Sequence, residues 1–251
     1  MDLSGFLRHV RRGRPMPPGP SLGDIYRSCF ETLLSVKLSL TVVIIGANDG
    51  RVNDPFYPVA QTHAARTRVM LVEPQVSLHQ ALGKNYAFHP DHTIVGGAIG
   101  PAGRLKLYAI KSKFWPLLQP AYARGWPPYR ASTGVTSSDR EMLVDWVAEH
   151  GHGLRPDDVI EELDVPCYPL MDALRVNGFP AQVDAIQIDA EGADDIVLYN
   201  CSISETCPHL IHFESKSLSQ DRQRNVEAFL SAAGYVVRAA GGDTLAIRVG
   251  H

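Results

Sequence analysis

The sequence predicts an α/β domain with a doubly wound sheet that is mostly parallel and ends in an antiparallel hairpin. Two observations support this fold class. From residue 24 to residue 233, short β-branched apolar runs alternate with segments in which apolar residues recur at helical spacing. Two further strand-like runs, 235–239 and 244–249, then flank the turn sequence Gly241–Gly242–Asp243. In sheets of this kind, ligands bind beyond the carboxyl ends of the strands.

The strands that we expect before the hairpin are continuous apolar runs, which are typical of strands covered on both faces. They are residues 41–45, 68–72, 93–97, 185–189 and 209–213. The segments between them have the apolar spacing of amphipathic helices. These expected helices are residues 24–37, 56–66, 77–88, 170–177, 193–199 and 219–233. Gly234 follows the last of them and is typical of a helix C-terminus.

One stretch, residues 111–156, does not follow this alternation. It contains all three tryptophans of the chain, and prolines and glycines separate its aromatic residues. Within it we expect a helix at 139–149, and Ser132–Gly134 before that helix forms either a turn or a backbone contact to a ligand. The stretch as a whole is either a surface excursion with a satellite core or a lid over the site.

The length of the chain suits one domain, and its 45% of hydrophobic residues can fill a large core. We therefore expect a basic segment and a Pro/Gly-rich linker at 1–20, followed by a single domain at 21–251. The net charge of −3 gives no general attraction for nucleic acid. The longest apolar run, 38–47, is too short to span a bilayer, and the basic N-terminus lacks the apolar stretch of a signal peptide. We expect a cytoplasmic protein whose four cysteines, none of them in a C-x-x-C pair, are reduced thiols.

The first candidate for chemistry is Val42–Gly50, in which a buried strand leads into a turn with two glycines. Glycine lets the backbone approach a ligand closely, and a following helix start can offer N–H groups to a carboxylate. The next strand ends in Glu73–Pro74. An acidic residue about twenty residues after a glycine turn suits the two hydroxyls of a ribose. The pair predicts a nucleoside pocket but does not separate NAD from S-adenosylmethionine (SAM).

The full pattern resembles the FkbM family of SAM-dependent methyltransferases over residues 41–249. The segments that carry the resemblance are I-G-A-N-D-G (45–50), V-E-P (72–74), A-I-G (98–100), I-D-A-E-G-A-D (188–194), H-F-E (212–214) and D-T-L-A-I (243–247). The family more often has valine at the position of Ala190 and glutamate at that of Asp194. The resemblance implies a Rossmann-like sheet of the class I methyltransferase type, and O-methylation of natural products and sugars.

The resemblance also implies which residues contact SAM. They are Gly46, Ala47, Asn48 and Gly50 beneath the methionine portion, Glu73 at the ribose hydroxyls, and Ala98 and Ile99 at the adenine. In a dinucleotide enzyme the glycine turn would instead face a pyrophosphate, and the resemblance disfavours that arrangement.

Two carboxylates, Asp189 and Glu191, stand two residues apart where the substrate should meet the methyl group. Methyl transfer is an in-line displacement that needs an aligned acceptor and a partner for its proton. Either a general base removes that proton or a divalent cation lowers the pKa of the hydroxyl. We expect Asp189 to contact SAM or a metal, and Glu191 to contact the substrate or a metal. Alternatively, one carboxylate orients the SAM amino group and the other caps the following helix.

His212 and Glu214 end the next strand and share one of its faces, because side chains alternate along a strand. Together with Asp189 they offer ligands for Mg²⁺, with Asp189 and Glu214 supplying carboxylate oxygens. His212 is either catalytic or a hydrogen-bonded structural histidine. His150 and His152 lie in the excursion, and either is a candidate base if a lid closes.

These observations favour a SAM-dependent O-methyltransferase that acts on a small or medium-sized polar acceptor. The aromatic excursion suits the apolar face of a sugar ring, and a polyketide or lipid-like acceptor about as well. An NAD(P)-dependent oxidoreductase is the alternative enzyme, although the sequence offers no convincing hydride-transfer pair. A non-catalytic protein that has kept the SAM-binding fold is the third interpretation. The sequence does not determine whether the protein forms a homo-oligomer.

Overall fold

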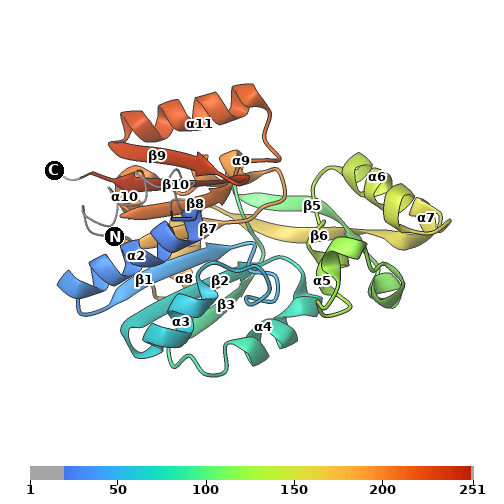
Figure 1. The fold of residues 1–251 in the computed structure, drawn as a ribbon, viewed down its shortest axis with the longest axis horizontal. Coiled ribbons are helices and arrows are strands. Elements are labelled where there is room, and N and C mark those ends of the chain that lie inside the picture. The colour runs from blue at the N-terminus through green and yellow to red at the C-terminus, as the bar shows by residue number, and fades with distance from the viewer. Residues whose placement is uncertain (1–19, 250–251) are drawn as a thin grey trace, which may run out of the picture.

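The computed structural model describes residues 20–249, which contain a central seven-stranded sheet (Figure 1). In spatial order its strands are β3 (His92–Gly96), β2 (Thr67–Glu73), β1 (Leu40–Ile45), β7 (Ala185–Ile188), β8 (Leu210–Glu214), β10 (Asp243–Arg248) and β9 (Tyr235–Ala240). The first five are parallel, whereas β10 runs antiparallel to both of its neighbours. The predicted fold class is therefore confirmed. The segment expected at 1–20 lies outside the described residues, except for Pro20.

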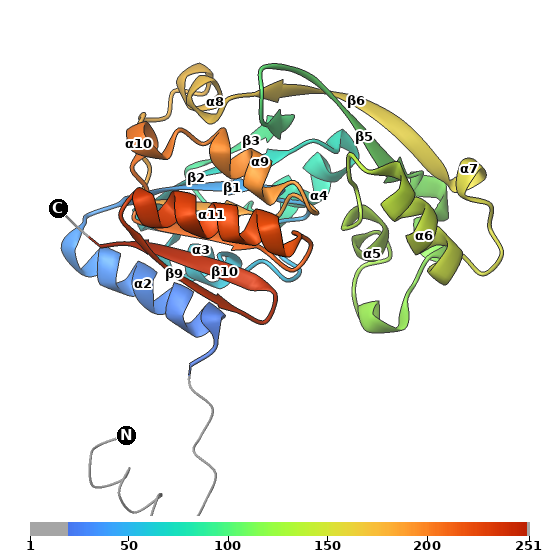
Figure 2. The same cartoon turned by 90° about the horizontal axis from the view of Figure 1, so that it is seen from above.

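Helices cover both faces of this sheet (Figures 1 and 2). On one face lie α2 (Leu22–Val36), α3 (Tyr57–His63) and α4 (His79–Asn85), with the short 3₁₀ turns η1 (Ala64–Arg66) and η2 (Val76–Leu78). On the other lie α8 (Leu170–Val176), α9 (Asp194–Tyr199), α10 (Ile203–Thr206) and α11 (Gln220–Ala232). The expected helices at 56–66 and 77–88 are thus each divided into an α-helix and a 3₁₀ turn.

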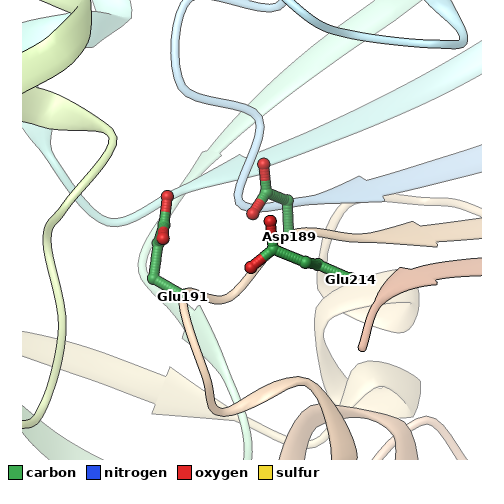
Figure 3. Close-up of side chains that lie close together, drawn as sticks. All are labelled: Asp189, Glu191 and Glu214. Atoms are coloured by element: carbon green, nitrogen blue, oxygen red, sulfur yellow. The ribbon is translucent and has the colours of Figure 1, made fainter. Parts of the chain in front are cut away.

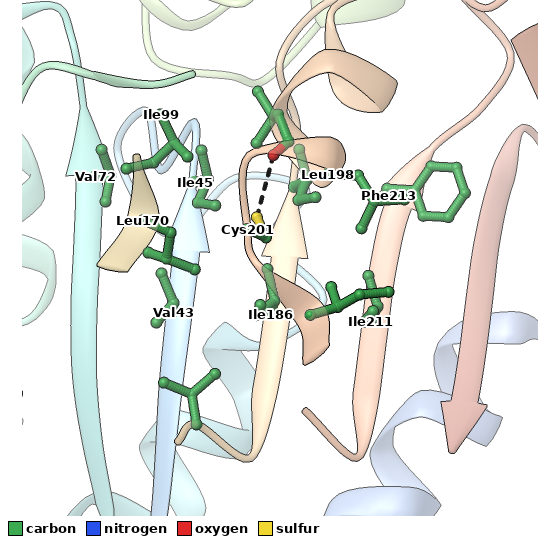
Figure 4. Packing of buried hydrophobic residues seen from close by; sticks show 14 of the residues in the cluster. Val43, Ile45, Val72, Ile99, Leu170, Ile186, Leu198, Cys201, Ile211 and Phe213 are labelled. Atoms are coloured by element: carbon green, nitrogen blue, oxygen red, sulfur yellow. Dashed lines mark hydrogen bonds between the residues drawn. The ribbon is translucent and has the colours of Figure 1, made fainter. Parts of the chain in front are cut away.

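The two cores follow from alternation along the strands. Figure 4 shows Val43, Ile45, Ile186 and Ile211 in the core beneath α8 to α11. The intervening residues of the same strands, such as Ile44, point into the core beneath α2 to α4. The central strands β1, β2 and β7 are therefore apolar at nearly every position, because both of their faces are buried.

Helix α2 begins at a capping box, in which the hydroxyl of Ser21 accepts from the Asp24 backbone N–H and the Asp24 carboxylate accepts from the Ser21 N–H. Its buried residues recur every four positions, so a single stripe faces the sheet. Tyr26 lies on this stripe and is fully buried above the carboxyl half of the sheet. The position of α2 therefore determines how much of the residues beneath it is exposed to solvent. His212 is one of these residues.

The aromatic excursion belongs to a larger insertion with a sheet of its own (Figure 2). The insertion contains β4 (Ala98–Ile99), β5 (Gly103–Ile110), η3 (Ser112–Leu117), η4 (Ala121–Ala123), α5 (Arg130–Thr133), α6 (Arg140–His150), α7 (Pro156–Val159) and β6 (Ile160–Tyr168). Its long antiparallel pair, β5 with β6, leads into a satellite core around Leu143 and Val147. These two strands are not evident in the sequence because their exposed residues interrupt the apolar runs.

Two other expectations concern the chain as a whole. Within residues 20–249, no helix combines the length and the apolar character needed to cross a membrane. All four cysteines fall within this range and are free thiols.

Candidate cofactor and acceptor site

The turn after β1 requires glycine for a steric reason. Gly46 has a φ of +76°, and a Cβ at this position would overlap the backbone carbonyl of Asp189. The Asp189 backbone N–H donates to Ile45 O at 2.9 Å, which holds the ends of β1 and β7 together. Gly46 therefore allows the loop to pass directly over the end of the neighbouring strand, and it leaves open backbone beside the cavities described below.

Glu73 lies at the carboxyl end of β2 and is 2% exposed. Its carboxylate accepts from the backbone N–H groups of Asn48 at 2.7 Å and Gln75 at 2.8 Å, one on each oxygen. Burial raises the pKa of Glu73 to about 7, although the two hydrogen bonds oppose this shift. A carboxylate offers about four lone-pair sites. After the two backbone bonds, each oxygen can still accept one ribose hydroxyl.

A first cavity of about 150 Å³ opens between the glycine loop, the end of β2 and the start of the insertion. Its lining includes five of the seven residues that the resemblance assigns to SAM, namely Gly46, Asn48, Glu73, Ala98 and Ile99. The other two lie elsewhere. Ala47 borders a second cavity. Gly50 lines neither cavity, and a Cβ there would collide with Leu82 and Tyr86, so this glycine permits close packing of the loop against these two side chains.

The second cavity has a volume of about 750 Å³ and lies in front of the ends of β7 and β8. Strand-end polar residues form one side of it, and Tyr122, Trp126, Trp146 and His150 of the insertion also line it. The two cavities meet at residues that line both, which are Gly46, Asn48, Arg130, Gly134, Asp189 and Glu191. Ligands held in the two cavities would therefore meet at these residues.

Three carboxylates gather at this junction, each offering an oxygen within 4.8 Å of the others (Figure 3). They belong to Asp189, Glu191 and Glu214. Burial, followed by the nearby Glu214, raises the pKa of Asp189 to about 6, and burial together with Asp189 raises the pKa of Glu191. The Asp189 Oδ1 atom is buried and has no hydrogen-bond partner among residues 20–249. Lys216 pairs with Glu214 at 2.5 Å and supplies part of the compensating positive charge.

The backbone holds Glu191 in an unfavourable conformation. Its φ is +46°, which costs a non-glycine residue on the order of 1–2 kcal/mol. Asp194 stabilises the loop by accepting from the backbone N–H groups of Ala190 and Gly192, both at 3.3 Å. This is the role of the last residue of the I-D-A-E-G-A-D segment, to which the sequence analysis gave no function. The local strain aims the Glu191 carboxylate at the junction.

The structure separates the candidate histidines. His212 borders the second cavity but is only 6% exposed, and its ring lies 4.9 Å from that of Tyr26. Burial lowers its pKa to about 4, so the imidazole is neutral near pH 7. His152 is exposed in the loop after α6 and lines neither cavity, so its geometry gives no support to a role as base. His150, by contrast, lines the second cavity.

Sequence reasoning missed Arg130 altogether. This arginine begins α5, is 8% exposed and lines both cavities. No motif surrounds it, and its neighbours in the sequence are aromatic, proline and small residues. A buried arginine is uncommon without a partner. The sequence does not reveal the burial of Arg130, because this burial depends on how α5 packs against the glycine loop.

The fold thus defines a doubly wound α/β protein with its pockets at the carboxyl edge of the sheet. A comparison with protein families matches residues 45–237 to the FkbM methyltransferase domain. The chain belongs to this family, and it is a methyltransferase whose family implies SAM as the methyl donor.

Solved methyltransferases have similar structures. FkbM methyltransferase from Methylobacillus flagellatus KT is 16% identical with a TM-score of 0.47, and the match covers 83% of this chain but 43% of that one. Precorrin-6y C5,15-methyltransferase from Geobacter metallireducens GS-15 is 10% identical, with coverages of 90% and 89% and a TM-score of 0.43. The O-methyltransferase TomG from Streptomyces achromogenes, solved with SAM, is also 10% identical, with coverages of 96% and 86% and a TM-score of 0.42. No curated protein matches the sequence.

Glu73 predicts an unusual pH dependence of stability. Because its pKa is raised from 4.5 to about 7, the folded protein binds more protons than the unfolded chain between these values. The free energy of unfolding without ligand should therefore fall as the pH rises from 4.5 to 7. Glu73→Gln cannot titrate, although its amide nitrogen also loses one of the two backbone N–H bonds. The fall of about 2–3 kcal/mol that the wild type should show between pH 4.5 and pH 8 should therefore be absent from this variant. Urea denaturation of both proteins at both pH values measures the difference, and an equal fall in the variant would contradict it.

Proposed function

We propose that this protein is a SAM-dependent O-methyltransferase that acts on a hydroxyl group of a small or medium-sized polar acceptor. The observation that carries the proposal is the meeting of two cavities at Asp189 and Glu191. One cavity suits a nucleoside cofactor, and the larger one suits an acceptor. Half-buried carboxylates at their junction are suited to removing a proton from an alcohol.

The residues of the first cavity fit SAM. Gly46 borders the cavity with backbone alone, and Glu73 keeps two acceptor positions for ribose hydroxyls. Ala98 and Ile99 provide small and apolar surface for an adenine. The unpartnered Oδ1 of Asp189 is an acceptor suited to the ammonium group of the cofactor.

SAM supplies a methyl group that is already activated on a sulfonium sulfur. The protein must therefore align the acceptor oxygen and take its proton while the C–O bond forms and the C–S electron pair remains on sulfur. We assign the proton to Glu191. Its raised pKa makes it a stronger base than an ordinary glutamate, and it borders both cavities.

Mg²⁺ held by Asp189, Glu191 and Glu214 is the alternative way to activate the hydroxyl. Carboxylate oxygens are the ligands that Mg²⁺ prefers, and Asp189 Oδ1 is free to bind. The ion pair between Lys216 and Glu214 favours the metal-free mechanism, because the ammonium group already occupies one ligand. Full activity in the presence of a chelator would support Glu191 as the base, whereas loss of activity restored by Mg²⁺ would support the metal.

The acceptor cavity supports a compound with both polar and apolar faces. Tyr122, Trp126 and Trp146 offer aromatic surface that packs against C–H groups, and Asp54 and Asp243 offer hydrogen-bond acceptors. A sugar ring has both kinds of face, whereas a polyketide or lipid-like acceptor would use mainly the aromatic wall. We infer that residues 111–156 form this wall and so belong functionally to the single domain at 21–251.

A thermal-shift panel with SAM, S-adenosylhomocysteine and NAD(P) tests the proposed cofactor. Binding to the native state raises the unfolding temperature, so SAM and S-adenosylhomocysteine at 100 times their Kd should each stabilise the protein by about 2.7 kcal/mol. NAD(P) should have no effect. Stabilisation by NAD(P) alone would contradict the proposal and favour an oxidoreductase. Binding of SAM without methyl transfer to any hydroxyl compound in an acceptor screen would favour a non-catalytic protein.

A further inference from the structure

Arg130 is a buried cation that forms no direct ion pair. It is 8% exposed, and its Nε donates to the carbonyl of Val52 at 3.4 Å. Within residues 20–249, no carboxylate lies within the 4.0 Å of an ion pair with its guanidinium group. Arg130 lowers the pKa values of Glu73, Asp189 and Glu191 from a distance, but none of these carboxylates bonds to it. Burying a charge without a direct partner is costly, so a guanidinium held in this way is suited to an anionic ligand.

The residues on either side of Arg130 hold the start of α5 at the glycine loop. Tyr129 donates its hydroxyl proton to Asp49 at 3.1 Å, and Thr133 donates to the Asn48 side chain at 3.2 Å. Gln75, beside Glu73, donates to the carbonyl of Thr133 at 3.0 Å. This part of the insertion is therefore bonded to the turns after β1 and β2, and a ligand does not have to order it first.

The charges of the first cavity are complementary to the charged groups of a methionine. Its acidic residues are Glu73, Asp189 and Glu191, of which Glu73 suits the ribose hydroxyls and Asp189 the ammonium group of SAM. The carboxylate of SAM needs a cation instead. Among the described residues that line this cavity, Arg130 is the only lysine or arginine.

We propose that Arg130 binds the methionine carboxylate of SAM, so that the insertion completes the cofactor site. The inference rests on the proposed function, because it takes SAM as the cofactor. Arg130 also lines the second cavity, and an acidic acceptor there would be the competing ligand. The hydrogen bonds that tie α5 to the glycine loop favour the cofactor.

Decarboxylated SAM tests this inference, because it lacks only the group that Arg130 is proposed to bind. Calorimetric titration without acceptor compares the two compounds on the wild type and on Arg130→Met, which keeps the apolar stem but removes the charge. The variant should bind SAM about 10–100-fold more weakly, since a charge-assisted pair is lost. Its affinity for decarboxylated SAM should stay within about twofold. Arg124→Met, which removes an exposed arginine of the same insertion, is the matched control and should bind both compounds normally.

Gly134→Ala provides a second test with an intact Arg130. Gly134 has a φ of −75°, which alanine adopts without strain, yet a Cβ there would overlap Nη1 of Arg130 and displace it. This variant should fold normally and lose affinity for SAM but not for decarboxylated SAM. If Arg130→Met does not fold, Gly134→Ala alone can test the inference.

Three results would overturn the inference. An equal loss for both compounds would give Arg130 a merely structural role. Unchanged SAM affinity in the variants would exclude the contact, and a raised acceptor KM in that case would assign Arg130 to an acidic acceptor. If the wild type itself bound neither SAM nor S-adenosylhomocysteine, the proposed function would fail first.

Discussion

Glu191→Gln should lower kcat by about 10²–10⁴-fold, because the amide cannot accept the proton of the acceptor hydroxyl. Affinity for SAM should change little, since the ribose and adenine contacts lie elsewhere in the first cavity. Stability should not fall, because burial and Asp189 already make the ionised form of Glu191 unfavourable. Steady-state kinetics, calorimetry and thermal denaturation on the same preparation separate these three effects.

The control for this variant is Glu161→Gln on β6, which removes the charge of an exposed glutamate. It should retain wild-type kcat. If Glu191→Gln also kept full kcat, Glu191 would not be the base. If Glu191→Gln lost SAM affinity in proportion to activity, the residue would belong to cofactor binding instead.

Gly46→Ala should destabilise the protein by about 3 kcal/mol or more and abolish SAM binding. Two costs add here. An alanine at a φ of +76° is strained, and its Cβ would have to displace the backbone carbonyl of Asp189. Because backbone at the end of β7 cannot move like a flexible side chain, the junction of the two cavities would be disrupted. Urea denaturation and SAM titration measure the two losses.

Gly178→Ala separates strain from collision. Gly178 follows α8 with a φ of +69°, but a Cβ there meets no atom within 4 Å. This control should cost only the strain of the left-handed conformation, about 1 kcal/mol, and should bind SAM normally. Equal stability losses in the two variants would show that the contact between Gly46 and Asp189 is unimportant.

The central sheet could be predicted from the sequence because burial on two faces produces a pattern of apolar residues in the local sequence. A strand such as Val42–Ile45 is apolar at every position, and the helices beside it repeat every three to four residues. The β5–β6 pair produces a weaker pattern of this kind. It has exposed residues among apolar ones and is held by partners about sixty residues away, such as Leu107 and Leu163. Its pairing depends on contacts that no local window contains.

The candidate site divides in the same way. Glu73, Asp189 and Glu214 could be placed together from the sequence, because the carboxyl ends of parallel strands share one edge of a sheet. The environment of His212 could not, since its burial depends on Tyr26 of α2, far away in the sequence. Gly50 likewise resembles a ligand-binding glycine in the motif, yet tertiary packing against α4 explains it.

The sequence by itself determined the fold class, the glycine loop and the order of acidic residues along the strand ends. These features are encoded in periodicity and in short motifs, which are properties of neighbouring residues. Only the tertiary structure decided that Arg130 lines both cavities and that His152 lines neither. The physical reason is that burial and unpaired charge are properties of packing, and in this protein a long insertion folds back onto the loop after β1.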